Sequence, residues 1–191
     1  KDFRTGVSDG MIHAATSDDG GKNWAIRGTV PVYPRTDPAN YHEPHTVELP
    51  SGRLVGMIRV EDQNTHTLAA AGIPSFSMVQ TVSDDGGATW SEPVPLKFHG
   101  SPPHLLRHSS GVLILTYGYR LAPYGQRVAL SYDNGTTWDH DWILRDDGPD
   151  NDLGYPATVE IPDQKLLTVY YQKAATGERC SILRSHWHLP Q

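Results

Sequence analysis

One eight-residue turn pattern occurs three times in this chain, and it constrains the fold more than any other feature. The copies cover residues 17–24, 83–90 and 131–138 and share the form Ser-x-Asp-x-Gly-x-(Thr/Asn)-Trp. In each copy the Asp can hydrogen-bond the turn backbone, the Gly can adopt the positive φ of a tight bend, and the Trp can be buried beneath it. A unit repeated at several tens of residues is typical of a stacked or radial architecture.

A second repeated segment lies between the turns, and each of its copies has proline at the second place. The copies start at Glu43, Pro102 and Tyr155. Each leads through a turn into a run of strand-forming residues, and these runs cover 53–60, 112–119 and 165–171. The offsets of 59 and 53 residues are comparable to the length of one four-stranded propeller blade.

The two repeats together predict an all-β fold that is part of a six-bladed β-propeller. We expect half a blade at 1–32 and blades at about 41–97, 100–146 and 152–188, all within one partial domain. At ~56 residues per blade, six blades need roughly 340 residues, so the chain is expected to form about half of the propeller, its C-terminal half. Unpaired strand edges would then favour self-association or association with a missing N-terminal half.

Composition excludes several classes of function. A net charge of −6 argues against a nucleic-acid or anionic-membrane surface, because such surfaces need clustered Lys and Arg. No apolar stretch approaches the ~20 residues that span a bilayer. Cys180 is the single cysteine, so no disulfide can form within the chain. His104 and His108 lie about 13 Å apart along a strand, too far to share an ion. We therefore expect neither a metal site nor a cofactor.

The second repeat also positions candidate functional residues. In a propeller the innermost strand of each blade begins near the axis, so Glu43, Pro102 and Tyr155 are expected at matching lips of a central pocket. Two blades then offer a carboxylate and a phenol where the middle blade offers a proline. Such asymmetry within a symmetric scaffold is typical of a functional site. A structural interpretation is also open, because Tyr packs at blade interfaces and Glu caps strands.

The turn pattern resembles the Asp box of sialidases and related β-propellers, and the similarity extends over essentially the whole chain. Residues 41–59 look like the sialidase segment in which a catalytic Glu precedes a strand and an Arg closes the next one. Residues 154–160 look like the segment that carries the nucleophilic Tyr. Arg127, four residues before the third turn, is placed like the last arginine of the family's triad, although Arg120 competes for that role.

The resemblance implies a retaining exo-α-sialidase that removes terminal sialic acids from glycans. Tyr155 would be the nucleophile and Glu43 its base, since a carboxylate nucleophile would be repelled by the carboxylate of the substrate. Arg59 and Arg127 would hold that carboxylate through paired, charge-assisted hydrogen bonds. The spacings of 16 residues from Glu43 to Arg59 and 28 from Arg127 to Tyr155 suit this assignment.

The chain departs from the family's pattern in two places. No residue matches the family's acid/base Asp or its first carboxylate-binding Arg, so the chain by itself is expected to be inactive. Residues 169–172 lack the acidic residue that many sialidases have there, which indicates an altered sugar preference. The start of the sequence does not decide between export and retention, and only the function class favours a secreted or periplasmic location.

Two other functions stay open. A propeller lyase or glycosidase that acts on uronate-containing glycans would also need arginines, and His45 or His104 could be its base. A non-catalytic glycan-binding propeller would bind acidic sugars without releasing any product. Because they occupy matching places in the repeat, the two histidines are otherwise expected to line the pocket or to pack.

Overall fold

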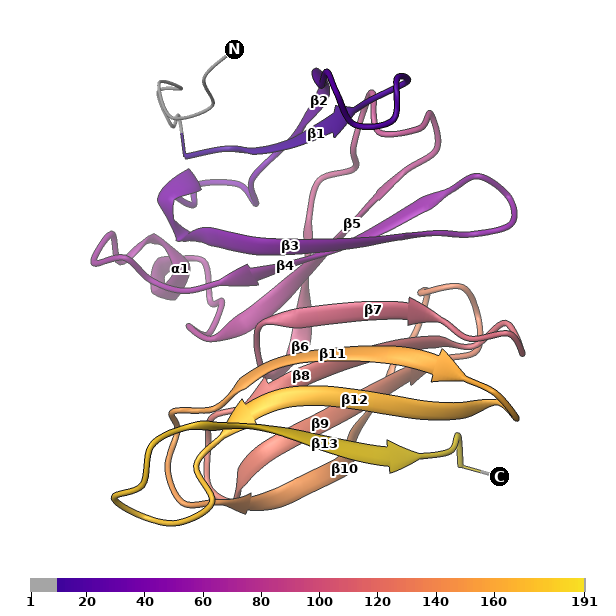
Figure 1. Cartoon of the computed structure of the whole chain (residues 1–191). Coiled ribbons are helices and arrows are strands. Elements are labelled where there is room, and N and C mark those ends of the chain that lie inside the picture. The colour runs from indigo at the N-terminus through magenta and orange to yellow at the C-terminus, as the bar shows by residue number, and fades with distance from the viewer. Residues whose placement is uncertain (1–9, 191) are drawn as a thin grey trace.

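The computed structural model describes residues 10–190, which form thirteen strands in four antiparallel sheets (Figure 1). A 3₁₀ turn (Pro38–Asn40) and a single helical turn, α1 (Thr67–Ala70), lie between strands. The strands are β1 (Ile12–Thr16), β2 (Ala25–Val30), β3 (Tyr41–Glu48), β4 (Leu54–Val60), β5 (Ser77–Ser83), β6 (Val94–His99), β7 (Pro103–Arg107), β8 (Leu113–Tyr119), β9 (Tyr124–Ser131), β10 (Asp139–Gly148), β11 (Gly154–Ile161), β12 (Lys165–Gln172) and β13 (Ser181–Trp187).

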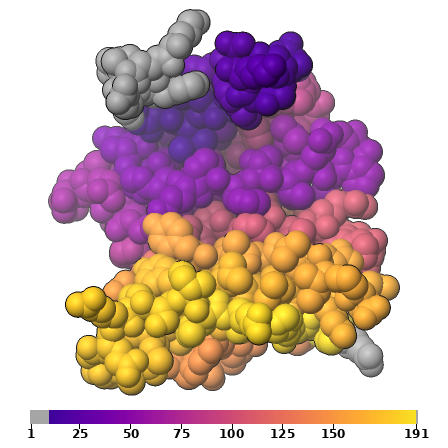
Figure 2. Space-filling model, in the orientation of Figure 1, coloured from indigo at the N-terminus to yellow at the C-terminus, as the bar shows by residue number. Residues whose placement is uncertain are grey.

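Each sheet is a meander of consecutive strands. The four sheets are β1–β2, β3–β6, β7–β10 and β11–β13. The prediction of an all-β fold is therefore confirmed, and the three runs of strand-forming residues appear as β4, β8 and β12. The first nine residues of the expected half blade lie outside the described residues. Figure 2 shows the last sheet, coloured orange to yellow, covering the lower part of one face of the molecule.

The sheets pack face to face, and each interface has its own apolar core. Val55 and Met57 of β4 enter the core shared with the β7–β10 sheet, whereas Ile58 enters the core on the β1–β2 side. In the same way Leu115 of β8 faces the β3–β6 sheet and Ile114 faces β11–β13. Because alternate side chains of one strand are buried in two interfaces, β4 and β8 have nearly continuous apolar sequences.

The first strands of successive sheets contact one another. β3 packs against β7, and β7 packs against β11, so these three strands lie side by side (Figure 1). Each of these strands coincides with one copy of the repeated segment that carries the candidate functional residues. The starts of three sheets are thereby brought into one region of the molecule.

Two histidines link these first strands. Nδ1 of His45 on β3 accepts a hydrogen bond from the backbone N–H of Leu105 on β7 at 3.1 Å. Nδ1 of His104 on β7 accepts one from the backbone N–H of Thr158 on β11 at 3.3 Å. The two imidazole rings also contact each other, with 4.3 Å between their centroids. The histidines therefore pack between sheets, which is one of the two roles expected from their matching positions.

Burial lowers the pKa of both imidazoles. For His104 the pKa falls to about 4, first through burial and then through the neighbouring charge of His45. The pKa of His45 is lowered by burial. Both rings are thus held neutral at pH 7, the state in which Nδ1 can accept a backbone hydrogen bond.

The three turns are braced by their Asp and Ser side chains, as predicted. In the second turn Asp85 accepts hydrogen bonds from the hydroxyl and backbone N–H of Thr89, and Ser83 Oγ accepts one from Gly87 N. The first and third turns repeat this pattern around Asp19 and Asp133. The glycines at the fifth place have φ between 85° and 88°: Gly21, Gly87 and Gly135.

The tryptophans of the turns differ in burial. Trp90 and Trp138 are half-buried, but Trp24 is 55% exposed. The expected burial of Trp24 is therefore wrong. Trp24 lies beside β2, and within the described residues its sheet has only two strands, which offer little surface to cover an indole.

Replacement of His104 by Leu should weaken and flatten the pH dependence of stability. In the native state His104 binds its proton only near pH 4, whereas in the unfolded chain it does so near the ordinary value of 6.5. The unfolded state therefore binds more protons between these values, so stability falls as pH falls from about 6.5 toward about 4. The variant also loses the acceptor for Thr158 N–H, which should cost about 1 kcal/mol at neutral pH.

Urea unfolding at a series of pH values measures both effects. His186→Leu is the matched control, because His186 is exposed on β13 and should leave the pH dependence as in the wild type. An unchanged pH dependence in His104→Leu would show that this contact does not couple protonation to folding.

Candidate active site

Two residues with left-handed backbone lie near the start of β3 and of β11, the first strands of the sheets on either side of the middle sheet. Glu43 and Tyr155 both have φ of 50°. Each lies at an irregularity of strand pairing, between His42 and His45 in β3 and between Gly154 and Ala157 in β11. Such irregularities redirect side chains, and a non-glycine residue at positive φ costs of order 1 kcal/mol. The structure tolerates this cost at two matching positions that face each other.

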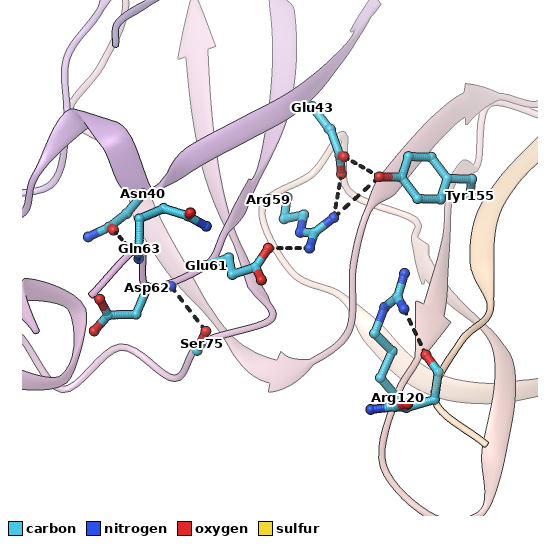
Figure 3. A network of polar contacts seen from close by, with 10 residues as sticks. Asn40, Glu43, Arg59, Glu61, Asp62, Gln63, Ser75, Arg120 and Tyr155 are labelled. Atoms are coloured by element: carbon cyan, nitrogen blue, oxygen red, sulfur yellow. Dashed lines mark hydrogen bonds and ion pairs between the residues drawn. The ribbon is translucent and has the colours of Figure 1, made fainter. Parts of the chain in front are cut away.

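Tyr155, Glu43 and Arg59 form one hydrogen-bonded network (Figure 3). The Tyr155 hydroxyl donates to Oε1 of Glu43. Nη1 of Arg59 donates to Oε2 of Glu43 at 2.9 Å and approaches the Tyr155 oxygen at 3.4 Å. The three side chains come from β11, β3 and β4, and 112 residues separate Glu43 from Tyr155. The structure thus brings together three of the four residues that the sequence indicated.

The network combines an accessible phenol with a nearly buried cation. Tyr155 is 50% exposed, whereas the Arg59 side chain is 10% exposed. The hydrogen bond to Glu43, followed by burial, raises the pKa of Tyr155, so the phenol keeps its proton at neutral pH. Burial disfavours the charge of Arg59, but the hydrogen bond and charge of Glu43, with the charge of Glu61, raise its pKa overall.

Arg127 does not belong to this network. It lies in β9 with 4% exposure, and its guanidinium donates to the backbone carbonyls of Gln126, Arg145 and Pro123. The guanidinium also lies 4.6 Å from the ring centroid of Tyr119. These contacts engage the donors that a substrate carboxylate would need. A substrate-binding role for Arg127 therefore stays a prediction without support from its contacts.

Arg120 approaches the network from the neighbouring sheet. It follows β8, and Figure 3 shows its guanidinium directed toward Tyr155. Nη1 donates to the backbone carbonyl of Asn151 at 2.7 Å, and the side chain also hydrogen-bonds Tyr171. Arg120 thus meets a carbonyl and a phenol, and no carboxylate of residues 10–190 forms an ion pair with it. Its charge is therefore suited to attract an anionic ligand.

Sequence reasoning missed two further residues beside the site. Glu61 accepts a hydrogen bond from Nη2 of Arg59, and the Tyr171 ring lies 5.9 Å from the Tyr155 ring. Tyr171 follows Tyr155 by 16 residues, the same interval that separates Arg59 from Glu43. Comparison of matching positions could therefore have found Tyr171, whereas no sequence signal reveals the contact of Glu61.

Within residues 10–190 no group of three or more His, Cys, Asp or Glu could hold a metal ion. The same residues include no helix with the length and apolarity that crossing a membrane requires.

The geometry suits covalent chemistry at a carbon atom that carries an anionic group. A phenol that hydrogen-bonds a carboxylate can attack as that carboxylate takes its proton. Cations beside the pair can hold an anionic substituent of the same ligand. Tyr155 has the exposure that such an attack needs, and Arg59 and Arg120 provide the cations.

Comparison with known proteins gives a family for most of the chain. The model of a family described as BNR repeat-like domain matches residues 6–168. No curated protein sequence matches the chain.

Solved structures share the fold. A protein of unknown function from Dyadobacter fermentans DSM 18053 is 29% identical, with a TM-score of 0.75 over 91% of this chain and 44% of its own. The intramolecular trans-sialidase from Ruminococcus gnavus, solved with oseltamivir carboxylate, is 23% identical, with a TM-score of 0.58 over 92% of this chain and 37% of its own. An α-L-arabinanase from Penicillium chrysogenum, solved with arabinobiose, is 20% identical, with a TM-score of 0.57 over 78% and 46%. The chain thus spans less than half the length of each of these structures.

Glu43→Gln should lower the pKa of Tyr155, because the hydrogen bond and charge of Glu43 are what raise it. The pKa can be followed by NMR of tyrosine labelled with ¹³C at Cζ, with Tyr155→Phe to assign the signal. Glu48→Gln, at the other end of β3, is the control and should leave the titration unchanged. A Tyr155 titration that is the same in Glu43→Gln and wild type would mean that the contact is absent in solution.

Proposed function

The chain belongs to the BNR repeat-like domain family, and on that premise we propose that it carries the nucleophilic side of a retaining exo-α-sialidase site. The proposed substrate is a glycan that ends in sialic acid or a related acidic sugar. The observation that carries the proposal is the hydrogen bond from the Tyr155 phenol to the Glu43 carboxylate, with Arg59 beside both.

A phenol is the nucleophile that this substrate class requires. Sialic acid has a carboxylate on its anomeric carbon, which would repel an attacking Asp or Glu. Tyr155 is neutral until it reacts, and Glu43 is placed to take its proton during attack. The pair therefore explains how a nucleophile can approach a carbon that carries a carboxylate without bringing a second negative charge close to it.

The proposed reaction has two displacements. Oη of Tyr155 attacks the anomeric carbon and its proton passes to Glu43. The glycosidic C–O bond breaks as the leaving oxygen takes a proton from the acid/base carboxylic acid that the sialidase resemblance implies and that this chain does not supply. Water then attacks the same carbon and gives a proton to the acid/base carboxylate, which is ionised after the first step. The bond to Tyr155 breaks, and Glu43 returns its proton to the phenolate. Two inversions give net retention of configuration.

We assign the substrate carboxylate to Arg59 and Arg120. Arg59 is next to both Glu43 and Tyr155. Arg120 directs its guanidinium, which has no ion-pair partner among residues 10–190, toward the same region. Arg127 was the sequence-based candidate for the second arginine, but its donors are engaged by backbone carbonyls. Arg120 also competed for this role in the sequence, and the direction of its guanidinium toward Tyr155 supports its choice here.

The proposal covers only part of the catalytic machinery. No residue of the chain matches the acid/base Asp and first Arg that the sialidase resemblance implies. The assay therefore uses the protein expressed from its complete reading frame. We propose that the chain by itself is inactive and that association with further propeller blades, or with itself, completes the site.

The alternatives receive less support from the contacts. A uronate lyase would use His45 or His104 as base, but Nδ1 of each accepts a backbone hydrogen bond from the next sheet. The similarity to an arabinanase shows that the fold alone does not select the sugar. A glycan-binding protein without activity would not need a phenol–carboxylate pair, so that pair favours the hydrolase.

Tyr155→Phe should abolish release of a fluorogenic leaving group from an α-sialoside, by about a thousandfold or more, since the nucleophile is removed. Glu43→Gln should lower turnover by about a hundredfold or more through loss of the base. Tyr132→Phe is the control, because Tyr132 is an exposed tyrosine in the third turn. Full activity in Tyr155→Phe would contradict the assignment. An inactive, well-folded wild type would instead favour uronate substrates or simple glycan binding.

Arg120→Gln should raise KM for the sialoside by about 10- to 100-fold with a smaller effect on kcat, because a charge-assisted hydrogen bond to the substrate is lost. Arg127→Gln should mainly lower the temperature of unfolding, because Arg127 holds three backbone carbonyls. Steady-state kinetics and thermal unfolding of both variants separate the two roles. The reverse outcome would return Arg127 to the substrate site.

A further inference from the structure

The loop that joins β4 to β5, residues 61–76, contacts the Arg59 guanidinium at both of its ends. At its start Glu61 accepts a hydrogen bond from Nη2. At its end the Phe76 ring lies under the guanidinium, with 5.4 Å between ring centroid and Cζ. Val60 pairs with Ser77 across the two strands, which places the first and last residues of the loop beside each other.

The loop is fixed by the buried side chain of Asn40. The Asn40 backbone carbonyl accepts from Glu61 N and its Oδ1 accepts from Gln63 N, both at 2.9 Å. Its Nδ2 donates to the hydroxyls of Thr65 at 2.8 Å and Thr67 at 3.0 Å. Two apolar residues of the loop enter the core on the β1–β2 side: Leu68 and Ile73. This segment is therefore a packed support that includes α1.

Glu61 changes how Arg59 can pair with Glu43. Arginine and carboxylate groups favour a two-bond arrangement in which both carboxylate oxygens accept from one guanidinium. Here Arg59 binds a single oxygen of Glu43, and the other oxygen accepts from Tyr155. Nη2 of Arg59, which could complete the two-bond pair, is engaged by Glu61 instead.

We propose that Glu61 is a positioning residue that keeps Glu43 available to Tyr155. By holding Nη2 of Arg59, Glu61 prevents a two-bond Arg59–Glu43 pair and fixes the plane of the guanidinium, which Phe76 supports from one face. As far as it concerns turnover, this inference rests on the proposed function. The arrangement itself can be tested without any substrate.

The first test follows the Tyr155 phenol by the ¹³Cζ-tyrosine NMR titration. In Glu61→Ala the Arg59 guanidinium is free to take both oxygens of Glu43, so Tyr155 loses its acceptor and its pKa should fall. Glu61→Gln keeps an oxygen that accepts from Arg59 and should restore most of the wild-type titration. Glu48→Ala is the control, because it removes a glutamate at the far end of β3 that contacts neither Arg59 nor Tyr155. It should leave the Tyr155 titration unchanged.

The second test measures turnover of the α-sialoside by the protein from its complete reading frame. Glu61→Ala should lower kcat by about tenfold, with a smaller change in KM, because the base is misplaced while the arginine charges remain. Glu61→Gln should recover most of the rate. If Glu61→Ala does not fold, Glu61→Asp withdraws the carboxylate by one methylene and should shift both readouts in the same direction.

The two tests separate failure of this inference from failure of the proposed function. A wild type that does not cleave sialosides, together with a Tyr155 pKa that is lowered in Glu61→Ala and restored in Glu61→Gln, would overturn the sialidase proposal and support the positioning role. An unchanged Tyr155 titration in Glu61→Ala, or in Glu61→Asp if that variant is used, would overturn the positioning role whether or not the protein is active.

Discussion

Face-to-face packing of the sheets is the constraint on which the rest of the structure depends. The central strands β4 and β8 are buried on both sides, so each sheet must be covered by its neighbours. This packing sets β3, β7 and β11 side by side, and His45 and His104 fix their relative height through backbone hydrogen bonds. Glu43 and Tyr155 then reach each other across the start of the middle sheet, where the matching residue is Pro102.

Much of this arrangement could be predicted from the sequence because it follows from repetition. The three turns identify a repeated hairpin, and the proline-containing segments mark the first strand of each sheet. Residues at matching places in a stacked repeat lie at matching places in space. That reasoning put Glu43 and Tyr155 at matching lips of one pocket, and the sialidase resemblance added Arg59, which contacts Glu43 in the structure.

The remaining features depend on where individual side chains point, which the repeat does not encode. Arg127 lies in β9 and Arg120 directly follows β8. Only the three-dimensional structure shows that Arg127 is buried against backbone carbonyls, whereas Arg120 is directed toward Tyr155. The support of Arg59 by Glu61 arises from a loop held by a single buried Asn40, a tertiary interaction with no local pattern. Trp24 keeps the motif, but its sheet has only two strands within residues 10–190 and leaves the indole exposed.

The long separation between Glu43 and Tyr155 has a consequence for how the protein is made. Contacts between residues far apart in sequence require closure of a long loop, and proteins dominated by such contacts fold slowly. Each meander can form from neighbours along the chain, but the phenol and the carboxylate meet only after two successive sheets have docked on the first. During synthesis on the ribosome, the phenol–carboxylate pair is therefore assembled after the segment around residue 155 has emerged, so partly made chains hold the carboxylate and its arginine without the phenol.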